Sequence, residues 1–345
     1  MRRFIYSLMT DRRKGVWFEP FKFILYLLSL IYAGGLAFRR FFYRVGIFKS
    51  ARLPLKIISV GNLTLGGTGK TPFVIMLAKL LKNEMSKEPC VLLRGWGWDE
   101  QNMLKNNLSD IPVFVSENRV KSALRAVRLY GSRIGILDDG FQYWELKRDL
   151  DIVLVDSRNP FGNGQLFPRG VLREKRDSII RADCVAFTKV NKKGIDIEEV
   201  KGAFKNVNSS IIFLEAVHRP KYFYDMKTKK TFDLNMIKRK RVILLSSIGD
   251  PEYFEETIKD LGADVIEHLI YPDHHNYRPK DMEFVTKRCN ERMLDLLLTT
   301  EKDAVKLARL HLAAGNYGLM VLAVEMEITS GREALIARLY RLYTG

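Results

Sequence analysis

A glycine-rich stretch, residues 64–72 (Thr-Leu-Gly-Gly-Thr-Gly-Lys-Thr-Pro), has the clearest potential for chemistry in this sequence. It follows an apolar run at 55–60 and precedes a helical pattern at 71–82. Strand, glycine-rich loop and helix in this order are typical of a phosphate-binding P-loop. Backbone N–H groups of the loop and the helix N-terminus would bind phosphate oxygens. We therefore predict a nucleotide-binding set comprising Gly66, Gly67, Thr68, Gly69, Lys70 and Thr71.

Within this loop, Lys70 would reach the β- and γ-phosphates of the nucleotide, and the Thr71 hydroxyl would bind Mg²⁺. The general pattern has glycine where this chain has Thr64. An ordinary turn rich in glycine and threonine is the alternative, which the strand and helix on either side disfavour.

Two acids, Asp138 and Asp139, follow an apolar strand predicted at 133–137. In P-loop proteins an acid at the end of such a strand binds Mg²⁺ directly or through water. If the strand continues, the two side chains point to opposite sides of the sheet. One acid would then serve Mg²⁺ and the other a neighbouring group. An Asp-Asp-Gly turn is the alternative.

Two further segments could move protons. Residues 271–277 contain adjacent histidines beside an acid, and a histidine oriented by an acid can support proton transfer. Neighbouring side chains diverge, so we do not expect His274 and His275 to bind one metal. Asp99, which follows the strand predicted at 90–93, could accept a proton from an attacking hydroxyl. From the residues alone, a solvent-exposed loop and an acidic surface turn stay open as alternatives.

A glycine-rich, basic loop at 161–174 follows the strand predicted at 151–155. The Arg173 guanidinium could hold a phosphate with two parallel hydrogen bonds. Arg119, Arg169 and Arg176 are weaker candidates for the same role. Each arginine taken singly could equally be a solvated charge.

The composition is that of a globular protein, with 47% hydrophobic and 28% charged residues in 345, so wholesale disorder is excluded. A net charge of +17 predicts a polyanionic partner: nucleic acid, anionic lipid or a phosphorylated substrate. The three cysteines lie far apart in apolar segments, which predicts buried free thiols in a reducing compartment. They are Cys90, Cys184 and Cys289.

The N-terminal segment favours lipid among these partners. Residues 23–38 carry no charge, but this run is shorter than the about 20 residues that a membrane span needs. Arginines and lysines flank it, and aromatic residues are interleaved. These features predict an interfacial helix on an anionic membrane surface, with a buried core helix and a true span as alternatives. A cleaved signal peptide is disfavoured because Arg39 and Arg40 follow immediately.

Strands and helices alternate from residue 56 onward, which predicts a doubly wound, mainly parallel α/β sheet. A composition change at 218–241 reads as a strand or hairpin linker, and a second βα pattern follows. We predict a membrane-associating segment at 1–50, a P-loop core at 51–217, a smaller α/β domain at 218–317, and a C-terminal strand and helix at 318–345 that return to the core.

Together these motifs resemble one family, the tetraacyldisaccharide 4′-kinases, or lipid A 4′-kinases, of Gram-negative bacteria. The matching segments are residues 59–72, 94–97, 137–142, 148–150, 172–174, 272–274 and 299–303. The resemblance implies transfer of the γ-phosphoryl of Mg·ATP to the 4′-hydroxyl of a tetraacyldisaccharide 1-phosphate, giving lipid IVA. It also implies a peripheral protein on the cytoplasmic face of the inner membrane. We expect a monomer whose partners are the acylated disaccharide and the anionic membrane surface, without nucleic acid.

The resemblance also implies roles for single residues. Asp99 would be the base, with His274 as its partner, and Lys70 and Asp139 would act beside the transferred group. Thr71, Asp138, Asp139 and Glu174 would lie at the metal. The implied substrate-binding residues are Asn62, Arg119, Gln142 and Arg173.

The chain departs from the family pattern in places. Only Trp98 separates Gly97 from Asp99, where the family has a longer insert, and Tyr143 stands where a histidine is common. The first departure puts the role of Asp99 in doubt. A P-loop switch or chaperone acting on a membrane-associated or polyanionic partner is the alternative function. A nucleic-acid-dependent ATPase is less favoured because the basic excess surrounds an apolar, aromatic segment.

Overall fold

The computed structural model describes residues 2–95, 97–192, 194–205, 208–294, 296–310 and 317–344. The chain forms two compact units. Unit 1 comprises residues 1–95, 108–217 and 326–345, and unit 2 comprises 96–107 and 218–325. The sequence did not separate residues 96–107 from the core predicted at 51–217. Strands β7 (Ile212–Asp225) and β12 (Gly318–Ser330) each begin in one unit and end in the other.

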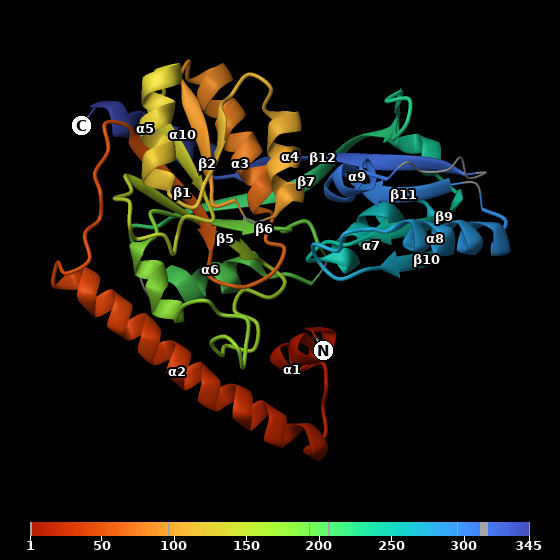
Figure 1. The fold of residues 1–345 in the computed structure, drawn as a ribbon, viewed down its shortest axis with the longest axis horizontal. Coiled ribbons are helices and arrows are strands. Elements are labelled where there is room, and N and C mark those ends of the chain that lie inside the picture. Colours follow the sequence, from red (N-terminus) through yellow and green to blue (C-terminus); the bar gives the residue numbers. More distant parts are fainter. Residues whose placement is uncertain are drawn as a thin grey trace. The chain divides into compact units, whose positions relative to one another are not determined.

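Unit 1 contains the predicted parallel sheet (Figure 1). Its strands run in the order β7-β6-β5-β1-β4-β2-β3, and neighbouring strands are parallel. This order confirms the doubly wound α/β prediction. The strands before β7 are β1 (Lys56–Asn62), β2 (Pro89–Leu93), β3 (Val113–Val115), β4 (Ile134–Asp138), β5 (Leu150–Asp156) and β6 (Cys184–Thr188).

Helices cover both faces of this sheet, so successive strand residues, which point to opposite faces, are buried on both. Ile57 on one face packs in a cluster with Ala123 of α5, while its neighbour Ile58 points the other way and is fully buried. Phe204 of α6 packs in a second cluster with Phe187 of β6. The helical elements of unit 1 after β1 are α3 (Lys70–Lys79) with a π-turn at Leu80–Glu84, α5 (Arg119–Tyr130), a 3₁₀ turn at Arg176–Arg181, α6 (Ile197–Lys205) and α10 (Arg332–Thr344).

The end of β1 fits tightly against the turn after β4. A Cβ atom added to Gly61 would lie 2.6 Å from Phe141 Cβ and 2.8 Å from Phe141 N. We expect Gly61→Ala to lower the free energy of unfolding by about 1–3 kcal/mol, because backbone must move to relieve this overlap. Thermal unfolding of the purified protein measures the effect. Gly202→Ala in α6 is the matched control, since a Cβ there meets no atom within 4 Å. An unchanged melting temperature for Gly61→Ala would contradict the packing described.

Unit 2 is built on parallel strands in the order β10-β9-β11-β12. Leu244 packs in a cluster with Phe254 of α7, and the alternate residue Leu245 packs with Val285 of α8. The end of β7 pairs antiparallel with β8 (Thr231–Phe232) as a hairpin, inside the segment where the sequence predicted a strand or hairpin. The remaining elements are α4 (Trp98–Asn107), a 3₁₀ turn at Leu234–Ile237, β9 (Arg241–Ser246), α7 (Pro251–Asp260), β10 (Asp264–Ile270), α8 (Pro279–Glu291), β11 (Leu296–Thr300) and α9 (Glu301–Leu307).

The cysteines are buried free thiols, as predicted. Burial raises the pKa of the Cys90 and Cys184 thiols to about 12, so neither is a thiolate at neutral pH.

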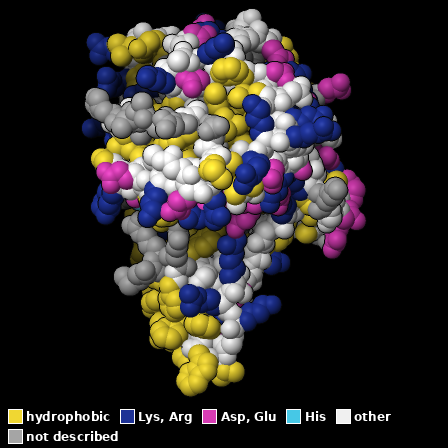
Figure 2. Space-filling view, turned by 90° about the vertical axis from the view of Figure 1, so that its right-hand side faces the viewer, with side chains coloured by type: hydrophobic (Ala, Val, Ile, Leu, Met, Phe, Trp, Pro, Cys, Tyr) yellow, Lys and Arg dark blue, Asp and Glu magenta, His cyan; other side chains and the backbone are white. Residues whose placement is uncertain are grey.

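The N-terminal segment folds as α1 (Arg2–Met9), a 3₁₀ turn (Val16–Phe18) and the long helix α2 (Glu19–Arg44). One side of α2 packs against the rest of unit 1: Ser29 Oγ donates to Leu166 O at 2.9 Å, and Tyr32 OH donates to Arg173 O at 2.9 Å. The other side is exposed and apolar, with Ile31 72% exposed. Figure 2 shows hydrophobic and basic side chains gathered at the lower end of the molecule.

By length and composition, residues 16–44 could cross a membrane. An 18-residue window of this stretch has a mean hydropathy of 1.8, and only 6% of that window is buried. The uncharged run predicted from sequence therefore lies inside a longer helix. The low burial is inconsistent with the core-helix alternative within this chain.

Candidate active site

The predicted phosphate-binding loop lies between β1 and α3, as the strand–loop–helix prediction requires. Gly69 precedes α3 in the left-handed region with φ of +83°, and no side chain caps the helix. Gly66 has φ of +122°, and a Cβ there would meet no atom within 4 Å. The loop therefore needs glycine at these positions and leaves the first turn of α3 able to donate N–H groups to an anion.

The loop is tied to its surroundings by polar side chains. Asn62 Nδ2 donates to Thr68 Oγ1 at 3.1 Å, and Gln142 Nε2 donates to Asn62 O at 3.1 Å. Asn62 is fully buried, so these two hydrogen bonds hold the loop in place. Two of the predicted substrate-binding residues thus lie against the loop and have a structural role that the sequence did not indicate.

The pair Asp138–Asp139 is brought to the same edge of the sheet. Asp138 pairs in register with Val60, close to the end of β1 that leads into the phosphate-binding loop. Strand β4 ends at Asp138, and Asp139 turns away with φ of +52°. The condition for opposite-facing side chains, a continuing strand, is therefore not met. Asp138 is 6% exposed, whereas the Asp139 side chain is 40% exposed.

Three basic side chains surround Asp139. Its Oδ1 accepts from Arg173 Nη1 at 2.6 Å and lies 3.7 Å from Lys70 Nζ, while Arg119 Nη1 donates to the backbone oxygen of Asp139 at 3.4 Å. Partial burial opposes ionisation of Asp139, but Lys70 and Arg173 lower its pKa below the ordinary value. The arrangement places two cations beside the phosphate-binding loop, suited to stabilising phosphate charge.

Glu174, implied as a metal ligand, is buried and engaged elsewhere. Its carboxylate accepts two bonds from Arg181 Nη2, at 2.9 and 2.8 Å, and lies 3.6 Å from Arg40. Within the described part of the chain, no group of three or more histidine, cysteine or acidic residues is arranged to hold a metal ion. The structure therefore supplies no support for Glu174 as a ligand, and this role stays a prediction. Arg181 carries no sequence motif that could have identified it.

Two of the three weaker arginine candidates, Arg169 and Arg176, have partners outside the phosphate-binding loop, whereas Arg119 contacts Asp139. Arg169 Nη2 forms an ion pair with Asp11 at 2.9 Å, and Arg176 lies over the Phe161 ring at 4.4 Å. Both contribute to packing near the N-terminal segment and the 161–174 loop, so their prediction as phosphate ligands gains no support.

In unit 2, the structure brings Asp99 and His274 together. Asp99 lies in the first turn of α4, and its Oδ2 is 3.1 Å from His274 Nδ1. His274 has φ of +59°, a left-handed conformation that non-glycine residues seldom adopt and that is frequent at functional sites. His275 instead contacts Asp281 at 3.0 Å, so the two histidines diverge as expected. The short Gly97–Asp99 connection thus does not prevent the pairing that the resemblance implied.

The Asp99–His274 pair has an uneven charge environment. Burial would raise the pKa of Asp99, but the hydrogen bond to His274 and the ammonium groups of Lys302 and Lys306 lower it well below the usual range. The hydrogen bond that His274 Nδ1 donates to Asp99 raises the pKa of His274, with burial and Lys302 opposing. Asp99 is 5% exposed, whereas the His274 side chain is 47% exposed.

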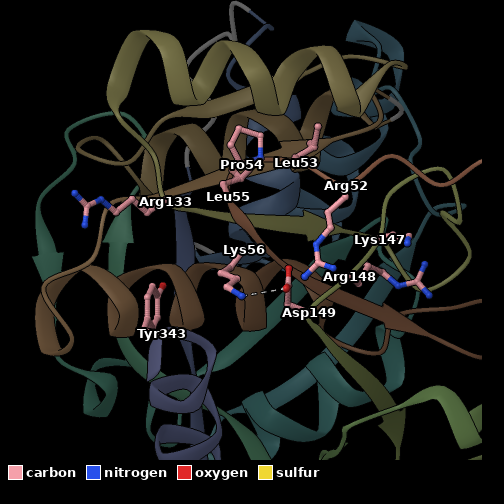
Figure 3. Close-up of a pocket in the computed structure, with 10 residues that line it drawn as sticks. All are labelled: Arg52, Leu53, Pro54, Leu55, Lys56, Arg133, Lys147, Arg148, Asp149 and Tyr343. Carbon is pink, nitrogen blue, oxygen red and sulfur yellow. Dashed lines mark ion pairs between the residues drawn. The ribbon is translucent and has the colours of Figure 1, made fainter. Parts of the chain in front are cut away.

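A cavity of about 430 Å³ lies at the opposite edge of the unit 1 sheet (Figure 3). It surrounds the residues that begin β1 and precede β4 and β5, including an ion pair of Lys56 with Asp149 at 3.5 Å. Ligands of doubly wound sheets bind at the carboxyl ends of the strands. The cavity therefore does not belong to the candidate site.

A family model, described as tetraacyldisaccharide-1-P 4′-kinase, matches residues 21–102 and 98–343. The chain belongs to this family. A tetraacyldisaccharide 4′-kinase of Syntrophus aciditrophicus is 37% identical over 321 residues, covering 84% of this chain and 85% of the relative. The one from Elusimicrobium minutum is 35% identical over 337 residues, covering 90% and 89%.

A solved structure supports the same relationship. The LpxK protein of Aquifex aeolicus, crystallised in complex with ATP, is similar with a TM-score of 0.72 and 28% identity, covering 94% of this chain and 99% of that one. The comparisons confirm the resemblance and the P-loop α/β fold predicted from sequence.

Proposed function

We propose that this protein transfers the γ-phosphoryl group of ATP to the 4′-hydroxyl of a tetraacyldisaccharide 1-phosphate, forming lipid IVA in lipid A biosynthesis. One observation supports the proposal above the others: a P-loop ending in Lys70 faces Asp139 and Arg173 in a chain of the 4′-kinase family. A relative in the family was crystallised with ATP.

The residues of unit 1 would bind and orient the phosphates of ATP. Catalysis of phosphoryl transfer rests almost wholly on positioning and on neutralising charge. The backbone N–H groups of the loop and Lys70 would hold the phosphate chain. Arg173, an arginine 2.6 Å from Asp139, can offer a second face of its guanidinium to a phosphate oxygen.

The residues present also fit Mg²⁺. This ion prefers hard oxygen ligands and keeps several of its waters, so it needs few protein groups. The Thr71 hydroxyl in the first turn of α3 and the Asp138 carboxylate at the end of β4 supply that chemistry, with Asp139 as a further candidate. When bound, Mg²⁺ would neutralise charge on the β- and γ-phosphate oxygens.

The Asp99–His274 pair of unit 2 would take the proton of the acceptor hydroxyl. A positioned acid–histidine pair contributes general-base catalysis when a hydrogen bond fixes the orientation of the ring. The prediction from sequence assigned the proton to Asp99. The 3.1 Å contact between Asp99 Oδ2 and His274 Nδ1 supports their acting as one unit.

The direct test uses purified protein, radiolabelled ATP, Mg²⁺ and tetraacyldisaccharide 1-phosphate, with products separated by thin-layer chromatography. We expect label in the lipid. Label only in free phosphate would instead support the P-loop switch or chaperone. Stimulation of ATP hydrolysis by DNA would support the nucleic-acid alternative.

We also propose that α2 lies on the cytoplasmic surface of the bacterial inner membrane. The exposed apolar side of α2, with basic residues along the same helix, matches an interfacial helix. We expect the protein to sediment with membranes at low salt and to be released by detergent or high salt, because salt screens the attraction to anionic headgroups.

A matched pair of variants isolates the contribution of α2. Ile31→Ser removes an apolar side chain that is 72% exposed on α2, and Met293→Ser removes one that is 85% exposed in unit 2. We expect weaker sedimentation with anionic vesicles for the first variant only. Complete recovery of the wild-type protein in the soluble fraction at low salt would contradict the proposal.

A further inference from the structure

The cavity of about 430 Å³ at the amino-terminal edge of the unit 1 sheet has a strongly basic lining (Figure 3). Every residue that lines it belongs to unit 1. Five of the ten lining residues are basic, and Asp149 is acidic. The basic residues are Arg52, Lys56, Arg133, Lys147 and Arg148. The phosphate-binding loop lies at the other edge of the sheet, so the proposed reaction does not account for this positive charge.

A backbone bridge holds two chain segments side by side at this cavity. Ala51 pairs with Leu146 as an isolated parallel bridge. Ala51 N donates to Glu145 O at 2.8 Å, and Lys147 N donates to Ala51 O at 2.9 Å. Arg52 and Lys147 therefore come from paired segments, and Figure 3 shows both side chains on the same side of the cavity.

The acidic lining residue is already engaged. Asp149 Oδ2 accepts from Ile57 N at 2.8 Å, and Asp149 Oδ1 lies 3.5 Å from Lys56 Nζ. These contacts brace the start of β1 against the residue that precedes β5. Figure 3 shows the Arg52 side chain extending toward this ion pair. A carboxylate carries a single negative charge, so Asp149 offsets the charge of Lys56 and leaves the rest of the lining uncompensated.

The remaining basic residues fall into two kinds. Arg148 has a partner in the protein, because its Nε donates to Asp151 Oδ2 at 2.9 Å. In the part of the chain that the structure describes, no acidic side chain forms an ion pair with Arg52, Arg133 or Lys147. All three are exposed. Three positive charges around one cavity thus have no counter-charge from the described residues.

This arrangement favours an anion that carries several negative charges. Like charges around a cavity repel one another, and an anion placed among them removes the repulsion and is attracted by each. Phosphate suits the lining, since a guanidinium binds two phosphate oxygens in parallel and an ammonium binds phosphate as a point charge.

The wall of the cavity also contains an unsatisfied polar group. The Tyr343 hydroxyl is buried and has no hydrogen-bond partner among the described residues. Burial raises the pKa of Tyr343 to about 12, so the hydroxyl keeps its proton at neutral pH and can donate it.

The size and the apolar part of the wall limit the kind of compound that fits. The volume of about 430 Å³ lies in the range of small-molecule pockets, about 300–1,000 Å³. The apolar lining is a single short segment, residues 53–55, which is too small to cover acyl chains. A water-soluble compound therefore fits better than a lipid.

We propose that this cavity is a second anion site, separate from the phosphate-binding loop, that binds a water-soluble compound carrying more than one phosphate group. Arg52 and Lys147 would bind phosphate oxygens from one side of the cavity. Lys56, at the start of β1, would be shared between the ligand and Asp149. The proposal concerns binding alone and does not rest on the proposed function.

The test measures binding of inorganic pyrophosphate to the full-length protein by isothermal titration calorimetry, in a Lys70→Ala background that weakens binding at the P-loop. We expect Arg52→Gln with Lys147→Gln to weaken the remaining binding by about tenfold or more, because two charge-assisted contacts are lost. The matched control, Arg241→Gln with Lys227→Gln, removes the same two types of charge from exposed positions in unit 2 and should bind as before.

Three results would overturn the site. Equal weakening in the cavity variant and in the control would show only general attraction to a basic protein. Loss of all pyrophosphate binding in Lys70→Ala would assign that binding to the P-loop. Weaker sedimentation of the cavity variant with anionic-lipid vesicles, with pyrophosphate binding unchanged, would replace the soluble ligand by a lipid headgroup. If the double variant does not fold, Lys147→Gln compared with Lys227→Gln tests the same charge at an exposed position.

The kinase assay separates this proposal from the proposed function. In otherwise wild-type protein, Arg52→Gln with Lys147→Gln should phosphorylate lipid at the wild-type rate when pyrophosphate is absent, because neither residue lies at the candidate active site. A wild-type protein that fails to phosphorylate lipid defeats the proposed function and leaves the calorimetry to decide the anion site.

Discussion

Lys70→Ala is expected to lower kcat/KM for lipid phosphorylation by about 10³-fold or more. Lys70 occupies the first position of α3, and its ammonium lies 3.7 Å from Asp139 beside the glycine-rich loop. Without it, the negative charge on the transferring phosphoryl group loses a cation placed at the loop. The fold should persist, because the buried residues of α3 that pack on the sheet, such as Phe73 and Leu77, are untouched.

The measurement is steady-state phosphorylation of tetraacyldisaccharide 1-phosphate by variants whose melting temperatures match the wild type. Lys79→Ala, at the other end of α3 and exposed, is the matched control and should retain activity. Lys70→Arg should stay impaired, since a planar guanidinium does not replace a compact ammonium at a close-fitting loop. Near-normal turnover by purified Lys70→Ala would remove the P-loop from the mechanism.

The P-loop could be predicted from sequence because all of its signals are local. A buried strand, glycines that allow left-handed backbone and a helix beginning at Lys70 are adjacent in the chain, and the structure has them in that order. The parallel sheet followed from the alternation of apolar strands and helices for the same reason.

Features that depend on distant contacts could not be predicted in this way. Residues 98–107 form α4, which belongs with unit 2 although it lies in the chain between strands of unit 1. Its first turn contains Asp99, whose contacts with His274, Lys302 and Lys306 span most of the sequence. An acidic surface turn was a reasonable alternative for Asp99 because nothing near it in sequence reveals these partners.

One missed element did have a local signal. Helix α9 begins after Thr300, whose Oγ1 accepts from Asp303 N at 3.2 Å and donates to Asp303 Oδ2 at 2.8 Å. Threonine followed three residues later by an acid is a helix-start pattern. This pattern, together with the spacing of four residues, is enough to place Lys302 and Lys306 on one helix face from the sequence alone.

The second large effect is expected for the Asp99–His274 pair. We predict that Asp99→Ala and His274→Ala each lower kcat by about 10²–10⁴-fold, the usual contribution of a positioned proton acceptor. The two side chains meet at 3.1 Å, so the orientation of the ring depends on the carboxylate. His274→Ala removes the imidazole, and Asp99→Ala leaves the imidazole without the carboxylate that orients it. After one of these substitutions, adding the other should therefore lower kcat little further.

The double variant decides whether the two residues act as one unit. We expect its kcat to fall no further than that of the more impaired single variant, which is the non-additive result for groups that share one step. Asp99→Asn should be included, because Asp99→Ala leaves the buried Lys306 without one of its acidic neighbours and lowers stability. His275→Ala is the control, since His275 contacts Asp281 instead, and its small effect should multiply with that of Asp99→Ala. Losses that multiply for Asp99 and His274 would show two independent contributions and would separate the pair that the structure joins.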